Sequence, residues 1–128
     1  MAFTAVLSQN SSITEDYVIL DKVLLNAGNA YNSTTGVFTC PDTDLYMFTW
    51  GGVHDVGRTG LWLHVNDVDV QHTWLTNTGS SSLTKTSGTS GNAYMLRCST
   101  GTRVQLFIYE NTLLADYTFF TGYKLPNQ

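Results

Sequence analysis

The stretch YNSTTGVFTCPDTDLYMF, residues 31 to 48, decides the fold of this chain. Aromatic and β-branched residues surround a Ser/Thr/Gly turn and a Cys-Pro step, and the stretch carries almost no charge. Residues 37–40 predict a strand that ends at Pro41, because proline cannot donate a hydrogen bond to a ladder. Residues 45–50 predict a second strand, with Tyr46, Phe48 and Trp50 on one face.

Further strands are predicted on both sides of this stretch, and almost nothing else. An arm over residues 61–65 turns at Asn66-Asp67 and returns over 68–74, which is typical of a hairpin. A second hairpin pairs 93–98 with 103–109, where Val104, Leu106 and Ile108 alternate with polar residues as in a half-buried strand. The remaining predicted strands cover residues 2–7, 17–26 and 117–125, with a weak one inside 76–91.

The spacing of these strands predicts an all-β fold. Turn signals recur every 8–12 residues or so, which is typical of a β-sandwich or jelly roll. A helix competes over residues 17–26, since leucine is a good helix former, but Gly28 and the β-prone surroundings favour a strand. At 128 residues the chain is expected to form a single domain over residues 1–128.

The composition excludes several classes of function. Only 12% of the residues are charged, about half the usual share of roughly 25%, while the hydrophobic share is 42%. The chain has only six Lys and Arg residues, no run of basic residues and a net charge of −4. It therefore offers no basic surface to neutralise phosphates, and nucleic-acid binding is not expected. No apolar run reaches the roughly 20 residues of a membrane span. The many Ser, Thr, Asn and Gly residues predict a polar surface with little charge. Such a surface is typical of an extracellular or glycan-facing protein.

Short motifs in a consistent order resemble the globular C1q domain family. They include the opening residues 2–5, then 23–26 with Gly28 and Tyr31, Phe38-Thr39-Cys40-Pro41, Leu45-Tyr46-Met47-Phe48, Gly101 before Val104-Gln105-Leu106, and Phe120-Thr121-Gly122-Tyr123. This resemblance covers essentially the whole chain. It implies a ten-stranded jelly-roll sandwich of two antiparallel sheets, related to the tumour necrosis factor fold, that assembles as a homotrimer.

The resemblance implies roles for several residues. Tyr46, Phe48 and Phe120 are expected in the core, where each contributes roughly 1.5–3 kcal/mol by burial. Gly36 and Gly122 are expected where a Cβ has no room. The candidate residues of the trimer interface are Trp50, Phe119 and Tyr123.

A calcium site is disfavoured by the last hairpin. Calcium-bearing members of the family place carboxylates near the apical loops, including just after the glycine of this hairpin. Here the residues after Gly101 are Thr102 and Arg103. No cofactor is therefore expected, and no metal ligands are assigned.

Three regions offer candidate ligand-binding residues, two of them before residue 75. His54, Asp55 and Arg58 lie in the Gly-rich stretch GGVHDVGRTG, which is either a binding tip or an ordinary exposed loop. Trp62, His64, His72 and Trp74 lie on the two arms of the 61–74 hairpin and are expected to share a face, where aromatic rings either stack on sugars or fill the core. The two histidines face each other in this interpretation, but a metal pair would need a third ligand.

Tyr109, Glu110 and Asn111 open the loop before the last strand, where they form either a polar pocket wall or a solvated loop. Cys40 and Cys98 share alternation parity with core positions. They bridge the two sheets if their Cα atoms lie within about 7 Å, and otherwise are two buried thiols. No catalytic triad, nucleophile elbow or phosphate loop is present, so an enzyme is not expected.

Two functions of different classes follow. The first is a secreted, trimeric C1q-domain recognition protein that binds carbohydrate or microbial surface patterns, as the resemblance to stand-alone invertebrate members of the family implies. Three weak sites on one rigid trimer would gain avidity. The second is a trimeric extracellular signalling ligand or matrix protein that binds a protein receptor.

Overall fold

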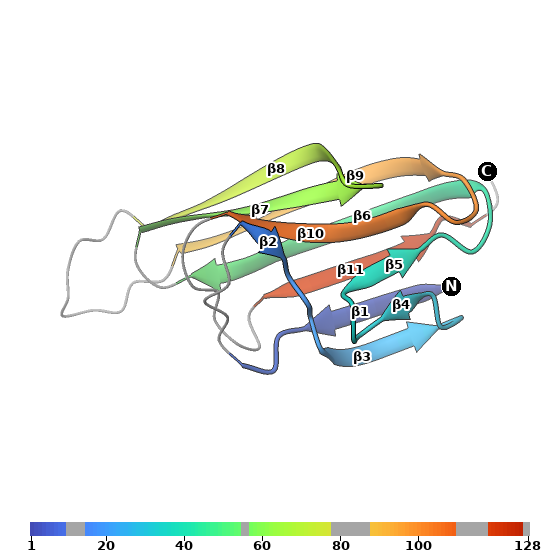
Figure 1. Ribbon diagram of the computed structural model, residues 1–128, viewed down its shortest axis with the longest axis horizontal. Coiled ribbons are helices and arrows are strands. Elements are labelled where there is room, and N and C mark those ends of the chain that lie inside the picture. The colour runs from blue at the N-terminus through green and yellow to red at the C-terminus, as the bar shows by residue number, and fades with distance from the viewer. Residues whose placement is uncertain (10–14, 55–56, 78–87, 110–117, 127–128) are drawn as a thin grey trace.

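The architecture is a sandwich of two antiparallel β-sheets (Figure 1). The computed structural model describes residues 1–9, 15–54, 57–77, 88–109 and 118–126, and these residues form eleven strands and no helix. The strands are β1 (Ala2–Val6), β2 (Asp16–Tyr17), β3 (Lys22–Ala27), β4 (Tyr31–Asn32), β5 (Val37–Thr39), β6 (Asp44–His54), β7 (Gly57–Val65), β8 (Val68–Asn77), β9 (Gly88–Cys98), β10 (Arg103–Tyr109) and β11 (Phe119–Lys124).

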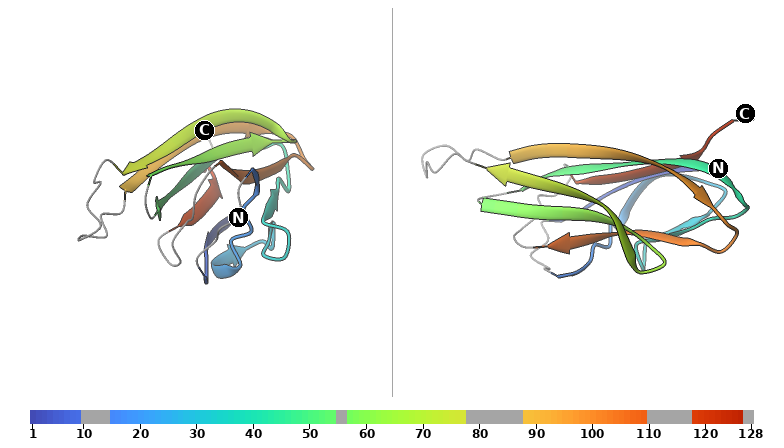
Figure 2. Two further views of the ribbon diagram at one scale, coloured as in Figure 1. Left: turned by 60° about the vertical axis from the view of Figure 1, so that its left-hand side comes forward. Right: turned by 90° about the horizontal axis from the view of Figure 1, so that it is seen from above.

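The two sheets interleave strands from all parts of the chain. The five-stranded sheet has the order β3-β1-β11-β6-β9, and the other has the order β4-β5-β10-β7-β8 with β2 paired beside β10. The edge strands β8 and β9 run side by side along one margin of the sandwich (Figure 2). The predicted ten-stranded jelly roll of two antiparallel sheets is confirmed, and the additional strand β2 is only two residues long.

The core between the sheets is aromatic. Phe3 stacks on Tyr31 and on Phe38, with ring centroids 4.8 and 5.1 Å apart, and meets Phe120 edge-on at 4.9 Å. From β6, alternate residues point into this core, as the predicted strand requires. The predicted core residues Tyr46, Phe48 and Phe120 are fully buried.

Two glycines are required by close packing. A Cβ on Gly122 would lie 2.5 Å from the ring of Phe3 and 2.8 Å from that of Phe48. At Gly36, φ is +75° and a Cβ would lie 2.6 Å from the carbonyl oxygen of Val18. Both positions therefore exclude a side chain, as predicted.

Several predicted strand boundaries are wrong. The continuous strand over residues 17–26 is instead divided into β2 and β3, which belong to different sheets. Between them Val18 and Leu20 insert into the core while Ile19 is exposed. Strands β6 to β9 run longer than predicted, and part of the weak strand placed in 76–91 lies outside the described residues. The turn of the β7–β8 hairpin is where it was predicted, because Asn66 and Asp67 have φ of 49° and 68°.

The second predicted hairpin, which pairs 93–98 with 103–109, is wrong. Strand β9 pairs with β6 in the five-stranded sheet, whereas β10 pairs with β5 and β7 in the other. The turn after Cys98 therefore crosses from one sheet to the other instead of closing a hairpin.

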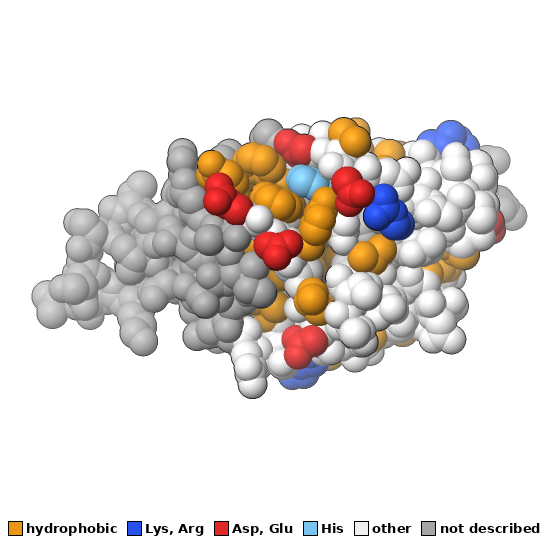
Figure 3. All heavy atoms as spheres, in the orientation of Figure 1, with side chains coloured by type: hydrophobic (Ala, Val, Ile, Leu, Met, Phe, Trp, Pro, Cys, Tyr) orange, Lys and Arg blue, Asp and Glu red, His pale blue; other side chains and the backbone are white. Residues whose placement is uncertain are grey.

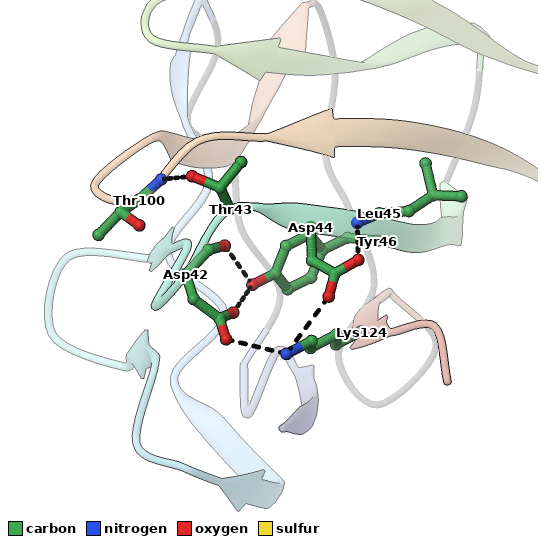
Figure 4. Close-up of polar contacts among 7 residues, drawn as sticks. All are labelled: Asp42, Thr43, Asp44, Leu45, Tyr46, Thr100 and Lys124. Atoms are coloured by element: carbon green, nitrogen blue, oxygen red, sulfur yellow. Dashed lines mark hydrogen bonds and ion pairs between the residues drawn. The ribbon is translucent and has the colours of Figure 1, made fainter. Parts of the chain in front are cut away.

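An ionic cluster holds the end of the sandwich at which β6 begins (Figure 4). The Lys124 ammonium, at the end of β11, donates to Asp42 Oδ2 at 2.8 Å and lies 3.4 Å from Asp44 Oδ2. The Tyr46 hydroxyl donates to Asp42 Oδ1 at 2.7 Å. These contacts tie β11 to the beginning of β6, the strand beside it in the sheet.

Strand β3 forms the edge of the five-stranded sheet opposite to β9. Its pairing with β1 shifts register between Thr4 and Ala5, which marks a β-bulge or irregularity. Leu24 and Leu25 on β3 are exposed, at 61% and 49%. Beyond β3 the chain returns to β4, where the Asn26 side-chain amide donates to the Tyr31 carbonyl at 2.8 Å.

Candidate functional site

The outward face of the six-stranded sheet carries a group of aromatic side chains. On β7 and β10 the inward positions are apolar and fully buried, so the alternate positions point away from the core. Tyr17 of β2 joins them, because β2 pairs with β10 at Phe107. We call this group the outer aromatic cluster; its members are Tyr17, Trp62, His64, Phe107 and Tyr109.

Four rings of the cluster form two stacked pairs. Trp62 stacks on Tyr109 with centroids 5.2 Å apart and an interplanar angle of 6°. His64 stacks on Phe107 at 4.8 Å and 2°. Because Trp62 pairs directly with Phe107 in the ladder, both stacks join diagonal neighbours of adjacent strands. The four rings therefore hold one another in fixed orientations, and all but His64 remain partly exposed.

Tyr17 covers one side of the cluster and connects it to a polar margin. Its ring meets those of His64 and Phe107 edge-on, at 5.4 and 5.5 Å. Its hydroxyl lies 3.0 Å from His64 Nδ1 and donates to Asp67 Oδ1 at 3.1 Å. Asp67 Oδ2 also accepts from the Arg103 guanidinium at 2.9 Å, so one carboxylate joins side chains from β2 and β10.

The electrostatics of this margin favour fixed charge states. The hydrogen bonds from Arg103 and Tyr17 hold the pKa of Asp67 below its ordinary value. Burial, with the neighbouring Asp67 carboxylate, raises the pKa of the Tyr17 hydroxyl. Around neutral pH the hydroxyl therefore stays protonated and the carboxylate ionised.

The charge around the cluster is predominantly acidic. Asp16, Asp67 and Asp69 are exposed beside it, and Asp69 pairs with His64 in the ladder, while Arg103 is engaged with Asp67. Figure 3 shows hydrophobic side chains gathered over β7 and β10, with acidic side chains around them and a basic side chain to one side. The arrangement is an apolar surface with hydrogen-bonding groups at its margin.

Three of the predicted site residues, Trp62, His64 and Tyr109, lie in this cluster. Of the others, Arg58 lies in β7 and His54 in β6, at strand positions whose side chains are outside the described part of the structure. Asp55, Glu110 and Asn111 are outside the described residues.

The second arm of the hairpin carries His72 and Trp74, which pair with Trp62 and Gly60 in the ladder of β7 and β8. His64 pairs instead with Asp69. The expectation that the two histidines face each other is therefore wrong, because the turn at residues 66–67 sets His64 opposite Asp69.

The prediction that Trp50 lies at the trimer interface is wrong. Trp50 is fully buried and its indole nitrogen donates to the Leu61 carbonyl at 3.1 Å, so its side chain belongs to the core. Phe119 and Tyr123 lie on the alternate positions of β11, which face away from the core; Tyr123 is 38% exposed.

Sequence reasoning missed Tyr17, Phe107, Asp67 and Arg103 as parts of the site. For Phe107 a signal existed, because the alternation that buries Leu106 and Ile108 puts Phe107 on the other face. Tyr17 reaches the cluster only through the pairing of β2 with β10, which joins segments far apart in sequence.

Metal binding finds no support at this site. Within the described ranges, no three His, Cys, Asp or Glu side chains are grouped so as to hold a metal ion. After Gly101, the turn supplies the Arg103 guanidinium, which repels a calcium ion and occupies a carboxylate. These residues do not fit a calcium site of the type found in the family.

Comparison with known proteins gives the same architecture. A family model described as the C1q domain matches residues 2–125. The globular domain of a zebrafish complement 1qA protein superposes with a TM-score of 0.78 at 20% identity, covering 99% of this chain and 98% of the other. Eiger TNF from S. frugiperda superposes with a TM-score of 0.76 at 11% identity, covering 100% and 94%. At these identities the likeness to the two structures shows the fold alone.

Proposed function

The chain belongs to the C1q domain family, and on that premise we propose that it is a secreted, trimeric, non-enzymatic recognition protein that binds carbohydrate through the outer aromatic cluster. The observation that carries this proposal is the pair of ring stacks on the outward face of β7 and β10. Among the described residues no helix is long and apolar enough to cross a membrane.

Aromatic rings held in this way suit the apolar faces of sugar rings. A pre-ordered ring loses little conformational entropy on binding, so burial of its exposed area contributes to affinity. The polar margin supplies hydrogen-bonding groups for hydroxyls, with Asp67 as acceptor and Arg103 as donor. The acidic surroundings favour neutral sugars over acidic ones, because an anionic sugar would approach Asp16 and Asp69 as well.

Trimer formation is proposed on the outward face of the five-stranded sheet. One row across this face runs Ala2–Tyr123–Met47–Met95 in the ladder. The next row runs Thr4–Thr121–Thr49–Ala93 and is also uncharged. Met95 is 51% exposed, and a side chain of this type commonly lies at an interface. Three copies would present three aromatic clusters on one rigid body and so gain avidity.

The test is binding of the purified protein to a panel of neutral and acidic glycans and microbial polysaccharides, with calcium and again with a chelator. Trp62→Ala should weaken binding about tenfold or more, because it removes the largest ring of the cluster. Leu24→Ala is the matched control, since it shortens an exposed apolar side chain on the other sheet, and it should bind as the parent does.

Two outcomes would contradict the proposal. Equal glycan binding by Trp62→Ala and the parent would place the site elsewhere. No binding to any glycan would overturn the carbohydrate assignment, and capture of a single tight protein partner would then support the alternative of a trimeric signalling ligand or matrix protein. Loss of binding in the chelator would show that calcium takes part after all.

A further inference from the structure

Two cysteines from different sheets meet inside the sandwich, away from the outer aromatic cluster. Cys40 directly follows β5 of the six-stranded sheet, and Cys98 is the last residue of β9 in the five-stranded sheet. They are 1% and 2% exposed and belong to the same core. Both are free thiols in this structure.

The backbone of Cys40 is hydrogen-bonded to the turn that follows Cys98. The Cys40 N–H donates to the Thr102 carbonyl at 2.8 Å, and the Gly101 N–H donates to the Cys40 carbonyl at 2.8 Å. Asp44, at the beginning of β6, pairs with Cys98 in the ladder. Both cysteines are thus held at one end of the sandwich by hydrogen bonds from neighbouring residues.

The two thiols are in hydrogen-bonding contact. Their mutual hydrogen bond lowers the pKa of the Cys98 thiol and, together with burial, raises that of the Cys40 thiol. The backbone hydrogen bonds of Cys40 to the turn after Cys98 and the burial of both side chains in one core bring the two sulfurs to the same place, as a disulfide requires.

We propose that Cys40 and Cys98 form an oxidative cross-linking site that takes a low-molecular-weight disulfide as its oxidant and joins the two sheets covalently. The proposal does not depend on carbohydrate binding. It assigns this pair a role that neither thiol has as a small core side chain alone.

The chemistry is a pair of thiol–disulfide exchanges. One cysteine thiolate attacks a sulfur of the small disulfide, forming a mixed disulfide and releasing one small thiolate. The second cysteine thiolate then attacks the protein sulfur of that mixed disulfide and releases the other small thiolate. In total the two cysteines lose two protons and two electrons, and the small disulfide accepts both electrons and becomes two thiols.

Burial determines when this reaction takes place. With 1% and 2% exposure, neither sulfur is open to the oxidant in the folded chain, so the exchange belongs to folding, before the two sheets close. Once formed, the bond is protected from reductants by the same core. It restricts the unfolded chain between β5 and β9, and should therefore raise thermal stability.

The experiment refolds the complete chain in a buffer of reduced and oxidised glutathione, then unfolds it in a denaturant that contains an alkylating reagent. The expected result is no alkylated cysteine and one cross-linked peptide pair that contains Cys40 and Cys98. Alkylation of both cysteines in the majority of molecules would overturn the proposal. So would a cross-link between two copies of the chain, visible on a non-reducing gel.

A stability measurement provides an independent check. The oxidised protein should melt roughly 5–15 °C above the same protein refolded in a strong reductant. The double variant Cys40→Ala, Cys98→Ala should show no such difference between the two conditions. If the double variant does not fold, the comparison of oxidised and reduced parent protein still decides, and equal melting temperatures would contradict the proposal.

Discussion

Tyr17 connects the rings of the outer aromatic cluster to their polar margin. It lies on a strand of two residues, yet it contacts His64 and Phe107 with its ring and Asp67 with its hydroxyl. Its position was not predictable from local pattern, because Tyr17 reaches the cluster through the pairing of β2 with β10, a strand far along the chain. Trp62 and Tyr109 were predictable as candidates because their strands alternate clearly.

Trp50 shows the opposite case. The alternation of residues 45–50 put it on the same face as Tyr46 and Phe48, which is correct. Its assignment to the interface contradicted that parity, because all three side chains point into one core. The period of the strand was therefore a better guide than the size of the side chain.

The first prediction concerns the Tyr17 hydroxyl. Tyr17→Phe keeps the ring contacts but removes the hydrogen bonds to His64 and Asp67. The free energy of unfolding should fall by about 0.5–1.5 kcal/mol, measured by urea denaturation. Tyr123→Phe, on the exposed face of the other sheet, is the control and should change it little. A Tyr17→Phe variant as stable as the parent would show that the network contributes nothing.

A second prediction concerns Gly122. The added methyl of Gly122→Ala would meet the rings of Phe3 and Phe48 inside van der Waals distance. Overpacking should lower the free energy of unfolding by about 1–3 kcal/mol in the same measurement. Thr121→Ala changes the adjacent residue, which faces away from the core, and should cost less. Equal losses for the two variants would contradict this account of Gly122.

At the scale of the elements, the β7–β8 hairpin was predictable and the non-local pairings were not. The β7–β8 hairpin follows from turn residues and alternation, which are local. The alternation of β9 and β10 was also visible, but their predicted pairing is wrong, because the turn between them crosses from one sheet to the other. The ends of the strands were harder to predict. Strands β6 and β9 continue through Gly51, Gly52 and Gly91, although glycine usually marks the end of a predicted strand. Their pairing with each other stabilises an extended conformation that neither segment specifies alone.

The link between β11 and β6 gives a pH-dependent prediction. Hydrogen bonds from Lys124 and Tyr46 lower the pKa of Asp42 below its unfolded value. A lowered pKa in the folded state contributes stability above the unfolded pKa, and that contribution is lost as the pH falls through the folded value. The parent should therefore lose more stability between about pH 5 and about pH 2 than Asp42→Asn does.

Urea denaturation across that pH range, with both proteins in the same salt, measures the difference. The same contacts raise the pKa of Lys124, so the loss at the acid side comes from Asp42 and not from the lysine. Parallel stability curves for the two proteins would show that the ion pair does not contribute.

At the scale of the whole molecule, the family and the two-sheet sandwich were predictable because motifs from both sheets occur in the right order along the chain. The ligand was not, because specificity belongs to surface residues that the fold does not determine. The proposed trimer would connect fold and ligand, since three outer aromatic clusters on one body would bind with greater avidity than one.

Met95→Asp tests the assembly. It places a charge in the apolar row that β11, β6 and β9 present to solvent, and desolvating that charge in an interface should shift the protein from trimer to monomer. Sedimentation velocity at micromolar concentration measures the change. Val68→Asp, at an exposed position of the other sheet, is the matched control and should leave the trimer intact. A parent protein that sediments as a monomer would contradict trimer formation itself.

The edge strand β3 has a consequence for colloidal behaviour. An edge strand offers unpaired backbone groups to any other extended chain. On β3 the exposed apolar side chains of Leu24 and Leu25 would also favour contact with such a chain. Its irregular register with β1 opposes such growth, because a bulge bends an edge away from the flat geometry that stacks into fibrils. We therefore expect the irregularity between Thr4 and Ala5 to oppose amyloid-like polymerisation, in a chain of which only 12% of the residues are charged.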